Sequence, residues 1–187
     1  MPRSGAGARA RLREAALDLY EQQGYDATTT AQIAERAGVT ERTYFRHFAD
    51  KREVLFDGEA ALLDTMVAAI VDAPDDLSLL ALVLRAYDGA VPLVVAGRPV
   101  AHRRARIIAT SPALQERARA KAAAVDEAVT HAVAGRGVPE PTARLTARIG
   151  AAIFERAVAD WNGVGADDLT RLIDAASAEV SDLVRRD

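Results

Sequence analysis

The chain has 187 residues, enough for one compact domain or for a small domain followed by a medium-sized one. It contains 41 alanines but only nine aromatic residues, and alanine is the strongest helix former and is depleted from strands. The net charge is only −3, which disfavours disorder, and the absence of cysteine excludes disulfides, thiolate metal sites and cysteine nucleophiles. We therefore expect an all-α protein of about nine helices.

The same composition bears on compartment and chemistry. No stretch approaches 18 uncharged apolar residues, and the N-terminus lacks the apolar centre of a secretion signal, so we expect a cytoplasmic protein without a membrane partner. The three histidines are scattered, and neither a Glu-x-x-His pair nor a nucleophile–base arrangement is visible. We expect no catalytic site, no metal and no cofactor.

Charge is distributed unevenly along the chain. Residues 1–56 hold nine Lys/Arg and eight Asp/Glu, whereas residues 57–187 hold 15 and 19. Within the first part, basic residues gather in two places: Arg3, Arg9 and Arg11, then Arg42, Arg46, His47, Lys51 and Arg52. Any nucleic acid would therefore be bound through a local basic footprint and not through net charge.

The first 56 residues predict four helix starts. Residues 9–23 have apolar residues at helical spacing and end at Gly24, a C-terminal cap. Thr29 begins a second, short helix as part of a capping box, and Gly38 ends it. Thr40 is the cap of a third helix, which runs to His47. A second capping box at residues 50–53 opens a longer helix that reaches residue 70.

Residues beyond 73 predict further helices with core-facing apolar stripes. One begins near Leu77 and should kink or end near Val91, because Pro92 follows. A short segment, residues 100–109, comes after Gly97-Arg98-Pro99, and Ser111-Pro112 opens an alanine-rich helix to about residue 134. The last two helices are expected at 142–162 and 167–186.

The second and third helices have the arrangement of a helix-turn-helix. Gly38 supplies the small residue at the turn, and the apolar residues Ile33, Ala34, Val39 and Phe48 are suited to lock the pair. The second helix of such a pair lies in the major groove with its N-terminal residues on base edges. Two short helices and a glycine also occur in proteins that never touch DNA, so this pattern alone leaves DNA binding open.

A longer run of residues resembles a known family. Gly24-Tyr25, Thr28-Thr29-Thr30, Ile33-Ala34, Ala37-Gly38-Val39, Thr43-Tyr44-Phe45, His47-Phe48 and Lys51 follow the order and spacing of the N-terminal domain of TetR-family transcriptional regulators. The resemblance covers about residues 9–56 and contains no insertion. It implies a helix-turn-helix DNA-binding domain at 1–56 and a helical ligand-binding and dimerisation domain at 57–187.

The resemblance also implies roles for individual residues. Base edges would be read by Glu41, Arg42, Thr43 and Arg46, and phosphates would be held by Thr30, Tyr44, His47 and Lys51. Position 45, which many family members fill with tyrosine, is Phe45 here, so whether Tyr44 replaces its hydroxyl is open. Phe45 and Phe48 are better explained as core residues, and Glu41 could instead favour the helix N-terminus or pair with an arginine.

In this family, residues after about 56 sense a ligand and form the dimer. We expect an apolar pocket with a few polar anchors, formed by Met66, Ile70, Leu84, Tyr87, Asp88, His102, Arg103, Ile107, His131, Phe154 and Trp161. Arg103, Arg104 and Arg106 either attract an anionic ligand or form a solvated charged face. Residues 142–162 and 167–186 would form half of a four-helix homodimer interface.

The resulting hypothesis is a homodimeric repressor that binds a pseudo-palindromic double-stranded DNA operator and is released by a small-molecule effector. Two alternatives remain. One is a helical architectural DNA-binding protein without an effector, which would not need about 130 further residues. The other, an α-helical enzyme, has no supporting motif.

Overall fold

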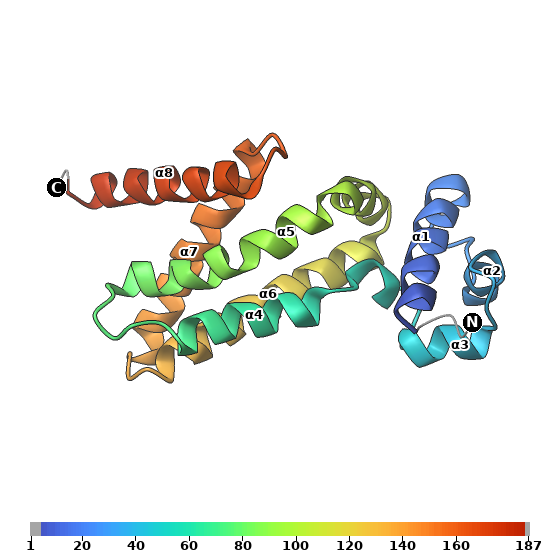
Figure 1. Cartoon of the computed structure of the whole chain (residues 1–187), viewed down its shortest axis with the longest axis horizontal. Helices are drawn as coiled ribbons and strands as arrows, with labels where there is room; N and C mark the ends of the chain where they lie inside the picture. The colour runs from blue at the N-terminus through green and yellow to red at the C-terminus, as the bar shows by residue number, and fades with distance from the viewer. Residues whose placement is uncertain (1–4, 186–187) are drawn as a thin grey trace. The chain divides into compact units, whose positions relative to one another are not determined.

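The structure, a computed structural model, describes residues 5–185 and contains eight α-helices, one 3-10 helix and no strand within that range (Figure 1). The elements are α1 (Gly5–Gln23), α2 (Thr30–Arg36), α3 (Glu41–His47), η1 (Glu53–Phe56), α4 (Glu59–Val71), α5 (Leu79–Ala109), α6 (Pro112–Ala134), α7 (Glu140–Asp160) and α8 (Ala166–Arg185). The prediction of an all-α fold is confirmed, with eight α-helices in place of about nine.

The chain forms two compact units that are not contiguous in sequence. The first contains Met1–Glu59 together with Pro99–Arg119, and the second contains Ala60–Arg98 together with Ala120–Asp187. Helices α5 and α6 therefore each contribute to both units. The first unit adds a distant segment to the N-terminal domain expected at residues 1–56.

The first unit is built around one apolar core. Residues of α1, among them Leu12, Ala16 and Tyr20, pack with Ile33 of α2 and with Phe48, and the core continues through η1. Ile107 and Leu114, 4% and 0% exposed, join the same core from residues 99–119. The later segment thus forms part of the hydrophobic core that supports the first three helices.

The second unit has two apolar clusters. One joins Met66 and Ile70 of α4 to Val83 and Tyr87 of α5 and to residues of α6 and α7. The other joins α5, α7 and α8 around Trp161 and Leu169. Helices α7 and α8 follow one another and pack together, as Figure 1 shows.

Two expectations about helix boundaries are wrong. Helix α5 continues through Pro92 and Pro99, so it does not end near Val91 and residues 100–109 are not a separate segment. Val91 and Ile107, on either side of the two prolines, are buried and hold the helix although each proline removes a backbone hydrogen bond. The single long helix expected from residues 50–53 to residue 70 is divided into η1 and α4. Asp50 accepts from the Arg52 and Glu53 backbone amides as expected, but the chain that follows forms only the short η1. Gly58, at φ +94°, then separates η1 from α4.

Among the described residues, α5 is the one helix that could cross a membrane by length and composition. About a third of its most apolar window is buried within the fold, where Val83, Ala86 and Ala90 contact other helices of the second unit. Core helices of globular proteins pass the same test, so the finding is weak evidence for a membrane span.

Candidate nucleic-acid interface

Local hydrogen bonds define the turn between α2 and α3. The Thr29 side chain accepts from the Gln32 amide while the Gln32 side chain accepts from the Thr29 amide, which confirms the predicted capping box. Gly38 adopts a left-handed backbone (φ +66°), and the Val39 amide then donates to the Ala34 carbonyl at 2.9 Å. These contacts end α2 and let α3 begin after its cap, Thr40.

Helix α3 presents a polar and partly aromatic outer face. Glu41, Arg42 and Arg46, three of the four predicted base-reading residues, are exposed, and the fourth, Thr43, is half-buried. Phe45 is 52% exposed, so its assignment to the core is wrong, whereas Phe48 is 3% exposed and belongs to the core as expected. Tyr44 and Phe48 are four residues apart and occupy the buried face, which leaves Phe45 outside.

One predicted phosphate contact is bonded to one predicted base-reading residue. The Thr30 hydroxyl, on the first residue of α2, donates to a Glu41 carboxylate oxygen at 2.5 Å. Both groups would have to rearrange, or bind DNA together, in a complex. The bond also connects the N-terminal ends of α2 and α3.

The structure does not present Tyr44 to a phosphate. Its side chain is fully buried and its hydroxyl donates to the Asp50 carbonyl at 3.0 Å, because Tyr44 lies on the core-facing side of α3. Burial raises the pKa of the Tyr44 phenol. The Tyr20 hydroxyl similarly donates to the Lys51 carbonyl at 2.7 Å, so two tyrosines hold the turn at residues 50–51.

The Lys51 ammonium is bound to the loop before α2. Its Nζ donates to the carbonyls of Tyr25 (2.8 Å) and Thr28 (2.9 Å) and lies 4.1 Å from the centre of the Tyr25 ring. A protonated amine has three donors, and the Asp26 carbonyl lies 3.5 Å from it. Lys51 therefore closes the loop that leads into α2, a role that its position in the sequence did not reveal.

His47, the last residue of α3, is half-buried. Its Nε2 atom is buried without a hydrogen-bond partner, and desolvation, followed by the charges of Arg46 and Arg9, lowers the pKa of the imidazole. A phosphate reaching this ring would supply a partner that the free protein lacks.

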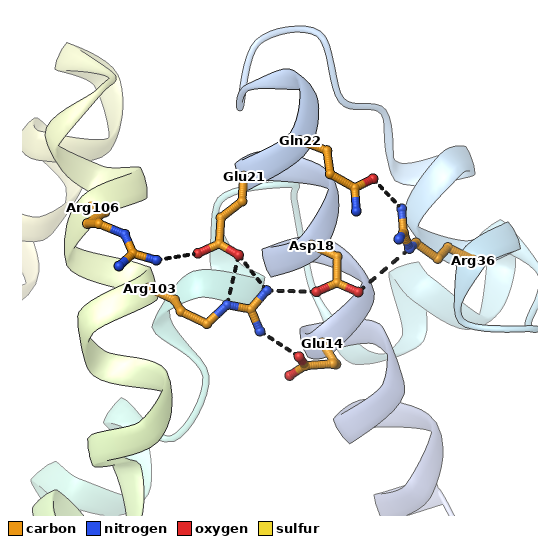
Figure 2. A network of polar contacts seen from close by, with 7 residues as sticks. All are labelled: Glu14, Asp18, Glu21, Gln22, Arg36, Arg103 and Arg106. Carbon is orange, nitrogen blue, oxygen red and sulfur yellow. Dashed lines mark hydrogen bonds and ion pairs between the residues drawn. The ribbon is translucent and has the colours of Figure 1, made fainter.

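A cluster of charges joins α1, α2 and α5 within the first unit (Figure 2). The Arg103 guanidinium donates to Glu14 (2.5 Å), Asp18 (2.7 Å) and Glu21 (2.7 and 2.9 Å). Arg106 adds a second bond to Glu21 at 2.9 Å. Arg103 and Arg106 are thus bonded to protein carboxylates and do not offer free charges to an anionic ligand.

The other predicted pocket residues divide among different surroundings. Met66, Ile70 and Tyr87 are buried in one cluster of the second unit, Trp161 is buried in the other, and Leu84 and Phe154 pack against both. The rings of Tyr87 and Phe154 stack with centroids 4.9 Å apart, which leaves no space between them for a ligand. His102 and His131 are exposed, and Ile107 lies in the core of the first unit. Asp88 is half-buried, and desolvation together with Asp174 raises the pKa of its carboxyl.

A hollow of about 380 Å³ lies elsewhere in the second unit, and none of the predicted pocket residues lines it. Its lining comes from α5, α7 and α8: Leu79, Leu80, Thr146, Ile149, Val180 and Ser181. The Thr146 and Ser181 hydroxyls donate to carbonyls of their own helices, so the lining is in effect apolar. Within residues 5–185 no group of three His, Asp or Glu side chains is placed to hold a metal ion.

Sequence reasoning missed the acidic residues that surround Arg103. Glu14, Asp18 and Glu21 lie at i, i+4 and i+7, which places three carboxylates on one face of α1. Arg103 and Arg106 are three apart on α5. Each spacing can be recognised in the sequence. The sequence does not show that the carboxylates of α1 pair with arginines of α5 more than 80 residues away.

Comparisons with known proteins agree with this geometry. Residues 12–57 match the family model described as bacterial regulatory proteins of the tetR family, and residues 77–185 match the MftR C-terminal domain. The HTH-type transcriptional regulator TcmR of Streptomyces glaucescens is 46% identical over 63 residues, which are 34% of this chain and 27% of TcmR. The tetracycline repressor protein class A from transposon 1721 (Escherichia coli) is 40% identical over 63 residues, 33% of this chain and 29% of the repressor.

The matched segment thus spans under a third of the length of these curated relatives. A solved structure of a TetR-family regulator from Mesorhizobium loti superposes with a TM-score of 0.58 at 18% identity, covering 93% of this chain and 95% of that one. That likeness shows a shared fold. Since the second family match alone covers more than half of the sequence, the two matches together decide the assignment: the chain belongs to the TetR family of transcriptional regulators.

Proposed function

We propose that this protein is a cytoplasmic, homodimeric repressor that binds a double-stranded DNA operator and leaves it when a small-molecule effector binds the second unit. The observation that carries the proposal is the outer face of α3, the second helix of the helix-turn-helix. On this face Glu41, Arg42, Phe45 and Arg46 are all exposed. A helix of this kind enters the major groove.

The side chains of α3 have complementary chemistry for base edges. Arg42 and Arg46 can each bridge the O6 and N7 acceptors of guanine, and Glu41 can accept from the amino group of cytosine. Around them, Thr30, His47 and Lys51 are the predicted phosphate contacts, of which His47 has a donor or acceptor free at its buried nitrogen. These roles imply operator half-sites that contain G·C pairs opposite α3.

The dimer is assigned to α7 and α8. Leu145 on α7 and Leu183 on α8 are 62% and 68% exposed, so each of the two helices presents a large apolar side chain to solvent. A two-fold pairing of these helices would bury them. A symmetric dimer reads half-sites about 34–36 Å apart, one turn of DNA.

Repression and release by an effector are inferred from the relatives. One relative is named as a tetracycline repressor, and the second unit has the apolar content that a small-molecule site requires. A ligand shifts the equilibrium only if it binds the DNA-free conformer more tightly than the bound one.

Selection from a random pool of duplex DNA, followed by electrophoretic shifts at moderate salt, tests the proposal. We expect a pseudo-palindromic site, and Arg42→Ala should relax the base preference at one position of each half-site. Sedimentation at micromolar concentration should give a dimer in the wild type and a monomer in Leu145→Glu. A chain that enriches no sequence, or that sediments as a monomer, contradicts the proposal.

A further inference from the structure

A cluster of charges lies on the side of α1 that faces α5, as Figure 2 shows. A single guanidinium, that of Arg103, makes four hydrogen bonds of 2.5–2.9 Å to three carboxylates. Such charge-assisted bonds are about twice as strong as neutral ones, and the rigid arginine fork fixes their directions. Arg103 thereby fixes both the rotation and the height of α1 against this part of α5.

The three carboxylates would repel one another without this partner. Glu14, Asp18 and Glu21 share one face of α1, where like charges at such spacings destabilise a helix. Arg103, Arg106 and Arg36 supply three positive charges for the three negative ones. With only 23% of its side chain exposed, Arg103 is less screened by solvent than a typical surface ion pair.

Asp18 connects this cluster to the helix-turn-helix. One of its carboxylate oxygens accepts from Arg103, and the other lies 3.7 Å from Nε of Arg36, the last residue of α2. Arg36 also donates to Gln22 at 2.8 Å. The end of α2, directly before the Gly38 turn and α3, thus contacts two residues of α1, of which Asp18 is bonded to Arg103.

Helix α5 gives this cluster a covalent connection to the second unit. The helix is continuous from Leu79 to Ala109; its residues through Arg98 belong to the second unit, and those from Pro99 onward belong to the first. Arg103 lies about one turn beyond that boundary. Arg98, just before it, has its guanidinium 4.5 Å from the Trp161 ring and donates to the Trp161 carbonyl.

From these contacts we infer that Arg103 is a positioning residue for operator recognition: through Asp18 and Arg36 it holds α2 and α3 in the geometry that discriminates the operator from other DNA. This role rests on the proposed function. It requires no contact between Arg103 and DNA. A change in α5 that withdraws Arg103 would lower operator recognition and leave general attraction to phosphates unchanged.

The test measures two dissociation constants for each variant by fluorescence anisotropy, one for the selected operator and one for a scrambled duplex of equal length. Arg103→Gln should weaken operator binding about tenfold, within the range of typical coupling energies, and scrambled DNA less than twofold. Loss of folded protein weakens both equally, and loss of one positive charge also acts on both. We therefore compare the specificity ratio, which is the dissociation constant for the scrambled duplex divided by that for the operator. Loss of positioning lowers this ratio, whereas loss of folded protein or of one charge leaves it unchanged.

Two further variants sharpen the result. Arg104→Gln removes the same charge one residue away, outside the cluster, and should leave the ratio unchanged. Asp18→Asn should lower the ratio as Arg103→Gln does, and the double variant should lose no more than the larger single effect, because both act along one chain of contacts.

The outcomes distinguish this inference from the proposed function. If the wild type does not prefer the operator over scrambled DNA, the proposed function fails and the inference fails with it. If the wild type discriminates and Arg103→Gln discriminates equally well, or if the losses in the double variant add fully, only the role of Arg103 is overturned.

Discussion

Replacing Lys51 by methionine separates two roles for this residue, since methionine keeps most of the apolar stem and removes the charge. The family resemblance gives Lys51 a phosphate, whereas in the free protein its ammonium donates to the carbonyls of Tyr25 and Thr28. A phosphate contact affects DNA binding only. A tie to the loop before α2 affects the stability of that loop.

The magnitude follows from the contacts. Hydrogen bonds to charged groups contribute about 1.5–3 kcal/mol each, and an exposed cation–π contact such as that with the Tyr25 ring contributes about 0.5–1 kcal/mol. The loop is at the surface, so its carbonyls regain water when the ammonium is removed, and we expect a net loss of about 2 kcal/mol. Since 1.4 kcal/mol is a factor of ten, local opening should become about 30-fold more frequent.

Hydrogen exchange followed by mass spectrometry gives the assay, with peptides that span residues 24–30. Arg52→Gln is the matched control, because Arg52 is exposed and pairs with Asp50 of the same turn. We expect loop exchange to accelerate about 30-fold in Lys51→Met and little in the control. Normal loop exchange in Lys51→Met, together with a salt slope of operator binding reduced by about one, would refute the loop role and restore the phosphate role.

Three further outcomes are expected. Gly150→Ala should destabilise the second unit by about 1–2 kcal/mol in urea, followed by Trp161 fluorescence, because the new Cβ would lie 2.3 Å from Cγ1 of the fully buried Val83; unchanged stability would contradict this packing. In the same assay Gly97→Ala should stabilise the second unit by up to about 1 kcal/mol. The added Cβ would meet nothing within 4 Å, and alanine is the better helix former. Desolvation lowers the pKa of His47 in the folded protein, so the unfolded chain binds the proton more readily. The free energy of unfolding should therefore fall as the pH drops below about 6.5, and the imidazole should titrate below that value by NMR.

The first 50 residues were predictable because their determinants are local. A capping box places both partners three residues apart, so Thr29 and Gln32 identify a helix start without any tertiary information. Gly38 likewise marks a position that needs a left-handed backbone. In this stretch the predicted bounds of α2, the turn and α3 agree with the structure to within a residue or two.

The aromatic residues of α3 show where local reading stops. Tyr44, Phe45 and the C-cap residue Phe48 are all aromatic, and Tyr44 and Phe48 face the core whereas Phe45, the next residue round the helix from Tyr44, faces outward. Assigning both Phe45 and Phe48 to the core follows hydrophobicity and ignores this angle. The same angle takes Tyr44 away from the phosphates.

The residues predicted to form one pocket lie in different clusters for a different reason. A 3.6-residue period identifies which residues of a helix face inward, but not which helix they meet. Met66, Tyr87 and Trp161 are indeed inward-facing, and they meet other core residues. Arg103 and Ile107 face inward too, toward α1 and the core of the first unit, because α5 is long enough to enter both units.

The division of charge changes once the compact units replace the order of the chain. The first unit, with residues 99–119 included, holds 14 Lys/Arg and 11 Asp/Glu, and the second holds 10 and 16. Five arginines of the first unit come from residues 99–119, so much of the positive field of this unit originates outside the helix-turn-helix. Those residues also contribute Ile107 and Leu114 to its core. The segment that makes the first unit basic and completes its core is therefore continuous with the parts of α5 and α6 that lie in the second unit. The covalent connection ends at residues 99–119, and from there the side-chain bonds of Arg103 and Arg106 lead to Glu14, Asp18 and Glu21 on α1.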